Sequence, residues 1–485
     1  MNFLNAENGV VGSLWHKNDQ GYVVCRLSPR QCVMKEGQKG FCGVRMNRGG
    51  ELVTVNYGRS VRMTEEHIET EAVYHYKPGA RILSLGNIGC MMNCDFCQNW
   101  QTSQARKLDE KQVVDYTPEY IVETALKRNI DIISWTYNDP VVWHEFIMDT
   151  ARLAQKHGIK NLYKSAFYIS EEAALELCEV IDIFSISLKS MSEEFYRKVT
   201  KARLQPVLDA IKAIAPHAKH LEISQLVITD LNDNDKEARD TARWVVDNLG
   251  DHIPLHFVRF HPAYKYQDVD RTPIPLLHRA REIAYEEGVK YCYIGNVYED
   301  GVADSDCRNC GNHLVKRFGL NIQITGLDEH GNCTKCGAPS TIIPPDDHDM
   351  DALNFPEHIL LKRDEIEHIE FMWEKDVNAA HIEVPESVED CVLEIESLPI
   401  GSGMSKTVRL GQESNLDRIV MSRNGSDEKG FVVRHRDDLK VSIFPVLDRA
   451  HFPVDFSMED HAPFKSRKPL KKTVNDELYE DDCAV

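Results

Sequence analysis

Between residues 81 and 297, short apolar segments alternate with segments that have the pattern of amphipathic helices. Thr117-Pro118 is typical of a helix start, and Gly250 and Gly288 are typical of helix ends. Strands that alternate with helices form a parallel sheet, either a barrel or an open sheet, with its chemistry at the C-terminal ends of the strands. The expected strands are residues 81–86, 131–137, 161–166, 181–189, 220–228, 254–261 and 291–297.

The segment GNIGCMMNCDFCQNW directly follows the first expected strand and contains three cysteines with the spacing C-x3-C-x2-C, Cys90, Cys94 and Cys97. Thiolates are the usual protein ligands of a [4Fe-4S] cluster, and three of them leave one iron open to a small molecule. Phe96 supplies an aromatic wall beside the third cysteine. A zinc site completed by a distant ligand and a set of buried thiols are the alternatives, which the position after a strand disfavours.

The pattern C-x3-C-x-Φ-C, where Φ is aromatic, resembles the signature of the radical S-adenosylmethionine (SAM) superfamily. The resemblance implies a partial (β/α)6-type barrel within an α/β fold and a [4Fe-4S] cluster whose fourth iron is chelated by SAM. It also implies reductive cleavage of SAM to a 5′-deoxyadenosyl radical that takes a hydrogen atom from a substrate. A low-potential electron donor, such as a ferredoxin or a flavodoxin, follows from this chemistry.

A longer segment, GNIGCMMNCDFCQNWQTSQ, looks like the cluster loop of the radical SAM enzymes of the AmmeMemoRadiSam system, relatives of pyruvate formate-lyase activating enzyme. The resemblance runs from about residue 17 to residue 340, because further blocks follow in the same order: CRLSPRQCVMKEGQKGFCGVRMNRGGELVTVNYG, WTYNDPVVWHEF, YISEEAALEL, EEFYRKVTKARLQPVLDAI, LVITDLNDND and VRFHPAYK. It implies a glycyl radical on a partner protein as one target. Another protein or a small metabolite is the other option.

The resemblance also implies further contacts to SAM. TYNDP occupies the place of the loop that holds the amino group of SAM, so Asn138 and Asp139 are the candidates there. Lys189 matches a lysine near the carboxylate and ribose of SAM. His261, at the end of the sixth expected strand, is expected to face the adenosyl group, with Arg259 on the same strand face. For each of these residues a purely structural role is the alternative.

The chain departs from the family pattern at several positions. Ser28 replaces the second cysteine of the N-terminal motif C-x-L-C-P-x-x-C, so a bound metal and a reduced structural segment are both open for the remaining Cys25, Cys32 and Cys42. Ser187 replaces the aspartate of the family motif D-L-K, and Ser165-Ala166-Phe167 replaces T-N-G. These differences indicate a divergent member of the family.

A second set of four cysteines has spacing close to that of a zinc ribbon, and each pair is followed by a glycine: Cys307, Cys310, Cys333 and Cys336. Four thiolates close a tetrahedral site, so we expect a structural zinc, with an auxiliary iron–sulfur cluster or an empty site as the alternatives. The isolated cysteines are expected to be buried filler: Cys178, Cys292, Cys391 and Cys483.

The formal net charge of −20 disfavours a broad contact with nucleic acid or with an anionic membrane. An iron–sulfur and zinc-ribbon protein that binds nucleic acid is the rival from another class. Its cations would come from HLVKRFG and from the basic residues 465–472. The N-terminus lacks the pattern of a signal peptide and no segment has the apolar length of a membrane span, so we expect a cytoplasmic protein.

The changes in composition divide the chain into five expected parts. Short strand-like segments such as CVLEIESL indicate a β-rich accessory domain after the four-cysteine module, and the final segment passes from basic to acidic, as in disordered tails. The parts are an N-terminal cysteine-containing segment (1–62), the barrel core (63–300), the four-cysteine module (301–345), the accessory domain (346–463) and the tail (464–485).

Overall fold

The structure is a computed structural model that describes residues 9–61, 63–105, 108, 113–297 and 299–345, together with the strands between residues 359 and 446. The expected tail at 464–485 lies outside the described residues. No helix in the described part of the chain is long and apolar enough to cross a membrane.

An eight-stranded sheet forms the centre of the molecule, in the order β16-β15-β14-β13-β12-β11-β9-β8. The strands are β8 (Thr64–His67), β9 (Arg81–Gly86), β11 (Ile132–Thr136), β12 (Lys160–Ser165), β13 (Ile183–Leu188), β14 (His220–Val227), β15 (Leu255–Arg259) and β16 (Cys292–Gly295). All are parallel except β8, which pairs antiparallel with β9 at one edge. The seven expected strands and the partial-barrel fold class are therefore confirmed, although β15 ends at Arg259, two residues before His261.

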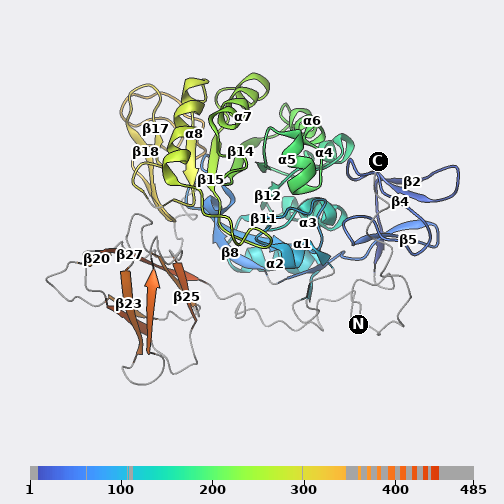
Figure 1. Cartoon of the computed structure of the whole chain (residues 1–485), viewed down its shortest axis with the longest axis horizontal. Helices are drawn as coiled ribbons and strands as arrows, with labels where there is room; N and C mark the ends of the chain where they lie inside the picture. Colours follow the sequence, from blue (N-terminus) through green and yellow to red (C-terminus); the bar gives the residue numbers. More distant parts are fainter. Residues whose placement is uncertain are drawn as a thin grey trace.

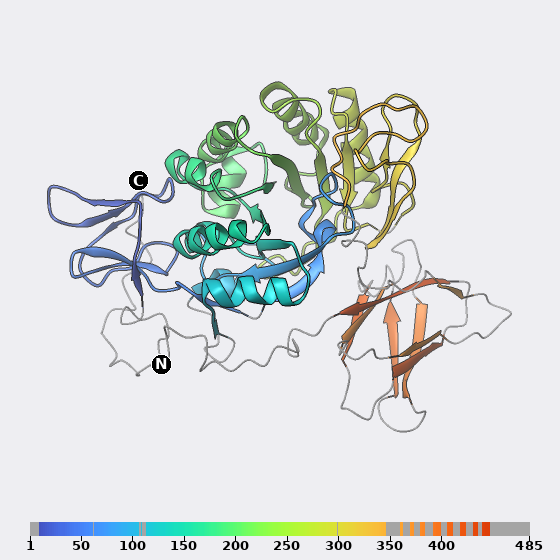
Figure 2. The ribbon, with the colours of Figure 1, turned by 180° about the vertical axis from the view of Figure 1, so that it is seen from behind.

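Helices cover the outer side of this sheet, as Figures 1 and 2 show. The longer ones are α2 (Pro118–Lys127), α3 (His144–Lys156), α4 (Glu171–Leu177), α6 (Leu204–Ile214), α7 (Asp235–Asn248) and α8 (Ile274–Glu286). The expected start of α2 is confirmed, because the Thr117 side chain accepts a hydrogen bond from the Tyr120 amide and Pro118 is the first helical residue. Shorter helices are η2 (Ile68–Glu71), α1 (Trp100–Ser103), η5 (Pro140–Trp143), α5 (Glu193–Phe195) and η6 (Tyr196–Thr200).

Side chains alternate between the two faces of each strand, and the two faces of the sheet differ in chemistry. The helix-facing side is apolar: Trp135 meets Phe146 of α3 with ring centroids 6.4 Å apart. We call the inner side of the sheet, away from these helices, the lumen, and the rows of residues that face it are polar. One row in register is Lys164–Ser185–Glu222, and the next is Ser187–Ser224–His256.

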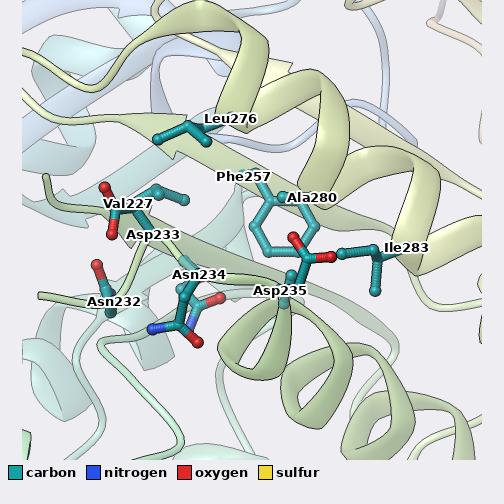
Figure 3. Close-up of a pocket in the computed structure, with 11 residues that line it drawn as sticks. Val227, Asn232, Asp233, Asn234, Asp235, Phe257, Leu276, Ala280 and Ile283 are labelled. Atoms are coloured by element: carbon teal, nitrogen blue, oxygen red, sulfur yellow. The ribbon is translucent and has the colours of Figure 1, made fainter. Parts of the chain in front are cut away.

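A small cavity lies on the helix side of the sheet, between α7 and α8 (Figure 3). Phe257, Asn234 and Ala280 contribute to its walls. Its volume of about 10 Å³ is close to the minimum that one water molecule needs. This cavity is therefore a packing gap and not a ligand site.

An apolar cluster closes the lumen at the N-terminal ends of the strands. Half of its residues come from the segment between β8 and β9, and the other half are the first inner-face residues of β9, β11, β12 and β13. The two sets are Ile68, Val73, Tyr76 and Ala80, and Ile82, Ile132, Leu162 and Ile183. Because this end is sealed, a ligand reaches the polar rows of the lumen from the C-terminal ends of the strands.

The N-terminal strands and the four-cysteine module lie at opposite ends of the central sheet (Figures 1 and 2). The N-terminal part has the sheets β1-β6-β5 and β2-β3-β4 and the pair β7-β10, with β1 (Val10–Val11), β2 (Trp15–Lys17), β3 (Val23–Cys25), β4 (Val33–Met34), β5 (Arg45–Arg48), β6 (Glu51–Thr54), β7 (Arg59–Ser60) and β10 (Val114–Asp115). The module has β17 (Ser305–Asp306), β18 (His313–Phe318) and β19 (Asn321–Ile324).

The described residues after 346 are strands in two four-stranded sheets, β20-β27-β22-β25 and β21-β26-β23-β24. Their bounds are β20 (Ile359–Leu361), β21 (Ile369–Met372), β22 (Ala379–Glu383), β23 (Cys391–Leu398), β24 (Ser405–Leu410), β25 (Arg418–Ser422), β26 (Gly430–Arg434) and β27 (Leu439–Val446). The strand-like segment CVLEIESL that was recognised in the sequence is β23.

Candidate active site

The three-cysteine loop follows β9 and therefore lies at the C-terminal ends of the parallel strands. Cys90, Cys94 and Cys97 are each partly accessible to solvent. Burial raises the pKa of Cys90 well above its usual range and that of Cys94 to about 12, while the nearby Lys189 ammonium opposes the rise at Cys94. Because the thiolate is the form that binds iron, iron has to displace these protons as it binds.

Asn138 fixes the path of this loop. Its side-chain amide donates to the carbonyl oxygens of Asn87 (2.9 Å) and Gly89 (2.8 Å), and its Oδ1 accepts from the Asn87 amide (3.1 Å). Gly89 has φ of +94°, and a Cβ there would lie 2.8 Å from the carbonyl oxygen of Cys42. The polar atoms of Asn138, predicted to contact SAM, are therefore engaged in positioning the cysteine loop.

Asp139, next to Asn138, has one engaged carboxylate oxygen and one without a partner. Its Oδ1 accepts from the Ser165 hydroxyl (2.7 Å) and from the Val141 amide (3.3 Å). Its Oδ2 is buried and has no hydrogen-bond partner among the described residues. Burial raises the pKa of Asp139, and its charge contributes to the raised pKa of Cys90, so the two residues are neighbours. A buried acceptor without a donor indicates a place for a donor on a ligand.

Lys189 lies one residue after β13, and both its backbone amide and its backbone carbonyl are hydrogen-bonded. Its amide donates to the Tyr196 hydroxyl (3.1 Å), and its carbonyl accepts from the Asn232 side chain (2.9 Å). Within the described part of the chain, its ammonium group has no hydrogen-bond or ion-pair partner. Ser187, which replaces the family aspartate, pairs with Ser224 at 3.2 Å between the hydroxyl oxygens.

The remaining predicted SAM contacts are placed differently from Asp139 and Lys189. Arg259 donates from Nε to the carbonyl of Thr272 (2.7 Å), in the segment before α8. His261 is partly exposed and lies beyond the end of β15, so the expected strand alternation does not extend to it. Phe96 is buried and packs near Phe195, with ring centroids 6.2 Å apart. The roles of Arg259 and His261 at SAM stay predictions.

The four-cysteine module gathers its sulfur atoms into one group. Cys307 and Cys336 have their Sγ atoms 3.6 Å apart, and those of Cys310 and Cys333 are 3.7 Å apart. A tetrahedral zinc with Zn–S bonds of about 2.3 Å requires sulfur atoms about 3.8 Å apart. A four-iron cube interposes its own edges between its ligands and needs wider separations. The geometry therefore fits a single zinc ion better than an auxiliary cluster.

The module is attached to the sealed end of the barrel through Arg317 of β18. This arginine is buried, and its guanidinium donates to the carbonyls of Tyr74 (2.7 Å) and Ala303 (3.1 Å) and lies 3.5 Å from Glu69. Because the three-cysteine loop is at the other end of the strands, the position suits a structural metal. Arg317 also belongs to HLVKRFG, so one of the two cations that the nucleic-acid alternative invoked there is inaccessible.

The N-terminal cysteines do not form a comparable group. Cys25, Cys32 and Cys42 are buried, as is Ser28 at the position of the missing cysteine. Among the described residues, their ligand atoms do not all lie within 4.8 Å of one another, as those of the four-cysteine module do. The Cys32 sulfur accepts a hydrogen bond from the Phe41 amide at 3.4 Å. This geometry favours the reduced structural segment over a bound single metal ion.

Known proteins resemble this chain in its sequence. Residues 86–245 match the model of the radical SAM superfamily. The chain is also 39% identical over 330 residues to the uncharacterized protein MJ0808 of Methanocaldococcus jannaschii, across 68% of this chain and 98% of that relative. This chain belongs to the radical SAM superfamily. It is therefore a radical SAM enzyme, with a [4Fe-4S] cluster and SAM as cofactors.

More distant radical SAM proteins also match. The pyruvate formate-lyase 1-activating enzyme of Escherichia coli (strain K12) is 22% identical over 193 residues, across 39% of this chain and 78% of that enzyme. A solved structure of a radical SAM methyltransferase from Sphaerobacter thermophilus has 14% identity and a TM-score of 0.36, across 45% of this chain and 66% of that chain. The distant homology to glycyl-radical activating enzymes is thus confirmed in the sequence.

The residues at the three-cysteine loop fit the radical SAM cofactors. Cys90, Cys94 and Cys97 are free thiols on one loop, and three thiolates are the donor set that leaves one iron of a [4Fe-4S] cluster open for SAM. Among the described residues, Asp139 Oδ2 has no donor and the Lys189 ammonium has no acceptor, and SAM carries one ammonium and one carboxylate. The sequence signals were strongest for the cysteines. They did not identify Lys164, an inner-face residue within the strand-like segment NLYKSA, or its neighbour Glu71.

Proposed function

We propose that this radical SAM enzyme binds its [4Fe-4S] cluster at Cys90, Cys94 and Cys97 and abstracts a hydrogen atom from a substrate in the lumen. When bound and reduced, the cluster supplies the electron that cleaves the S–C5′ bond of SAM and releases the 5′-deoxyadenosyl radical. The support comes from two groups of opposite charge near the cysteines, Asp139 Oδ2 and the Lys189 ammonium, neither of which has a partner in the part of the chain that the structure describes.

In this proposal the two charged groups hold the amino-acid end of SAM. Asp139 Oδ2 accepts from the ammonium of SAM, and Lys189 pairs with its carboxylate, because charge-assisted hydrogen bonds are the strong ones in a partly buried site. Asn138 keeps the loop in place through Gly89, and Ser165 orients Asp139. The sealed N-terminal end of the lumen leaves the substrate to enter on the same side as SAM and limits water behind it.

The substrate is either a protein or a small molecule. Matches to proteins named pyruvate formate-lyase 1-activating enzyme and 4-hydroxyphenylacetate decarboxylase activating enzyme support a partner protein, and formation of a glycyl radical on it is the alternative within this proposal. We place the chain in the AmmeMemoRadiSam group of radical SAM enzymes on the ordered sequence blocks. A ferredoxin or flavodoxin would deliver the electron.

The test is anaerobic reconstitution with iron and sulfide, followed by dithionite and SAM and by chromatography for 5′-deoxyadenosine. We expect the product with the natural chain and none with Cys94→Ala, because loss of one thiolate ligand prevents assembly of the cluster. Cys178→Ala is the matched control, since Cys178 is a partly buried thiol at the end of α4, away from the loop. Product from Cys94→Ala, or intact SAM with a fully assembled cluster, would contradict the proposal.

A further inference from the structure

Lys164 lies on the inner face of β12, in a row with Ser185 of β13 and Glu222 of β14. The inner-face residue two positions earlier, Leu162, belongs to the apolar cluster that seals the lumen. Lys164 therefore stands in the layer directly above the sealed end. It is partly accessible to solvent although neighbouring strands surround it, which places its ammonium in the lumen.

The ammonium group of Lys164 uses two of its three N–H donors within the protein. It donates to the hydroxyl oxygens of Ser185 and Ser224, at 3.0 Å each. In the described part of the chain, no carboxylate oxygen lies within 4.0 Å of it. An ammonium in a protein interior normally has a paired anion, because removal of its hydration shell is costly.

Two buried acids act on the Lys164 charge, and both are engaged elsewhere. Glu222 pairs with His220 (2.8 Å) and His256 (2.6 Å), and Glu71 is held by two hydroxyl groups. The Glu71 carboxylate accepts from the hydroxyls of Ser134 (3.1 Å) and Thr136 (2.7 Å). Burial raises the pKa of Glu71 to about 7. Burial likewise lowers the pKa of Lys164 to about 8, which leaves the ammonium as its main form at neutral pH. In the described part of the chain, neither Glu71 nor Glu222 lies within ion-pair distance of the Lys164 ammonium.

Lys189 faces the same space from the next strand. Its charge helps to lower the pKa of Lys164 and opposes the rise in the pKa of Cys94, so Lys189 lies near both groups. Two like charges in one cavity repel each other unless an anion separates them. If the carboxylate of SAM meets Lys189, as proposed above, Lys164 still has no anion within ion-pair distance among the described residues.

We propose that Lys164 binds an anionic group of the substrate, a carboxylate or a phosphate, and that Ser185 and Ser224 aim its third N–H donor into the lumen. This inference rests on the proposed function, because it takes the lumen as the substrate site. It adds a chemical class for the substrate: a molecule or side chain with an acidic oxygen group at the end that reaches farthest from the cluster.

The experiment measures the reductive methylation of individual lysines in the full-length reconstituted enzyme, with formaldehyde and a borane. Peptide mass spectrometry gives the rate at Lys164 and at Lys198, an exposed lysine paired with Glu194. The reaction is run in sodium chloride, sodium acetate or sodium phosphate at equal ionic strength. At an anion concentration about five times its dissociation constant, the methylation of Lys164 should be about sixfold slower, while Lys198 is unaffected.

Slower methylation in acetate alone indicates a carboxylate substrate, and slower methylation in phosphate indicates a phosphorylated one. Equal rates at Lys164 in all three salts would overturn the inference. The variant Ser185→Ala/Ser224→Ala keeps the amine but should lose most of the protection, and the unmodified chain alone suffices if this variant does not fold. Protection without formation of 5′-deoxyadenosine would leave the anion site standing and reject the proposed function, so the two failures are distinguishable.

Discussion

The substitution Asp139→Asn tests the proposed SAM site most directly. Asparagine retains an oxygen for the Ser165 hydroxyl (2.7 Å) and the Val141 amide (3.3 Å), so the local fold should persist. It replaces the unpartnered Oδ2 by an amide group, which donates hydrogen bonds and does not accept them. The SAM ammonium would then lose its charged acceptor and face a second donor.

The expected loss follows from the burial of this oxygen. A hydrogen bond to a charged group contributes about 1.5–3 kcal/mol. Its loss should increase the dissociation constant of SAM about 10- to 150-fold. The free energy of unfolding of Asp139→Asn should be equal to or higher than that of the natural chain. Burial raises the pKa of Asp139, so its charged form costs free energy in the folded protein, and the neutral amide removes that cost.

The assay is calorimetric titration of SAM into the reconstituted enzyme, with iron content and thermal unfolding measured on the same samples. Ser165→Ala serves as the matched control, because it removes the donor to Oδ1 and leaves Oδ2 in place. Its effect on SAM affinity should be about 1 kcal/mol or less. If Asp139→Asn binds SAM within about twofold of the natural chain at equal iron content, Asp139 does not hold the ammonium and the reasoning fails.

Three further outcomes are expected. Cys336→Ala should lower bound zinc from about one ion per chain to near zero without loss of iron, as elemental analysis would show, and retained zinc would contradict the geometry. Arg317→Met leaves the buried Glu69 carboxylate without its partner and should lower the free energy of unfolding by about 3–5 kcal/mol, measured by denaturant titration. An unchanged midpoint would reject the proposed attachment. Anion protection of Lys164 should weaken about tenfold per pH unit above about 8, since only its ammonium binds an anion; a pH-independent value would exclude Lys164 as the ligand.

Much of the fold could be predicted because its signals are local. Apolar strand segments, the Thr117-Pro118 helix start and the terminal glycines identified the seven parallel strands and the helices between them. Strand ends were less certain, and the shortened β15 separates His261 from the strand that was expected to orient it. The cysteine spacings likewise identified the three-cysteine loop and the four cysteines whose sulfur atoms the structure gathers, because residues close in sequence lie close in a loop.

The sequence by itself determined the radical SAM signature, the alternation of strands with helices and the spacing of the four-cysteine module. Tertiary structure decided what individual polar residues do. Asn138 and Asp139 are adjacent in TYNDP, yet their partners lie far away along the chain. Asn138 is engaged by the cysteine loop at Gly89, whereas Ser165 engages only one of the two carboxylate oxygens of Asp139. Lys164 faces the lumen because its strand aligns in register with Ser185, and such alignment between separate strands depends on packing of the whole sheet.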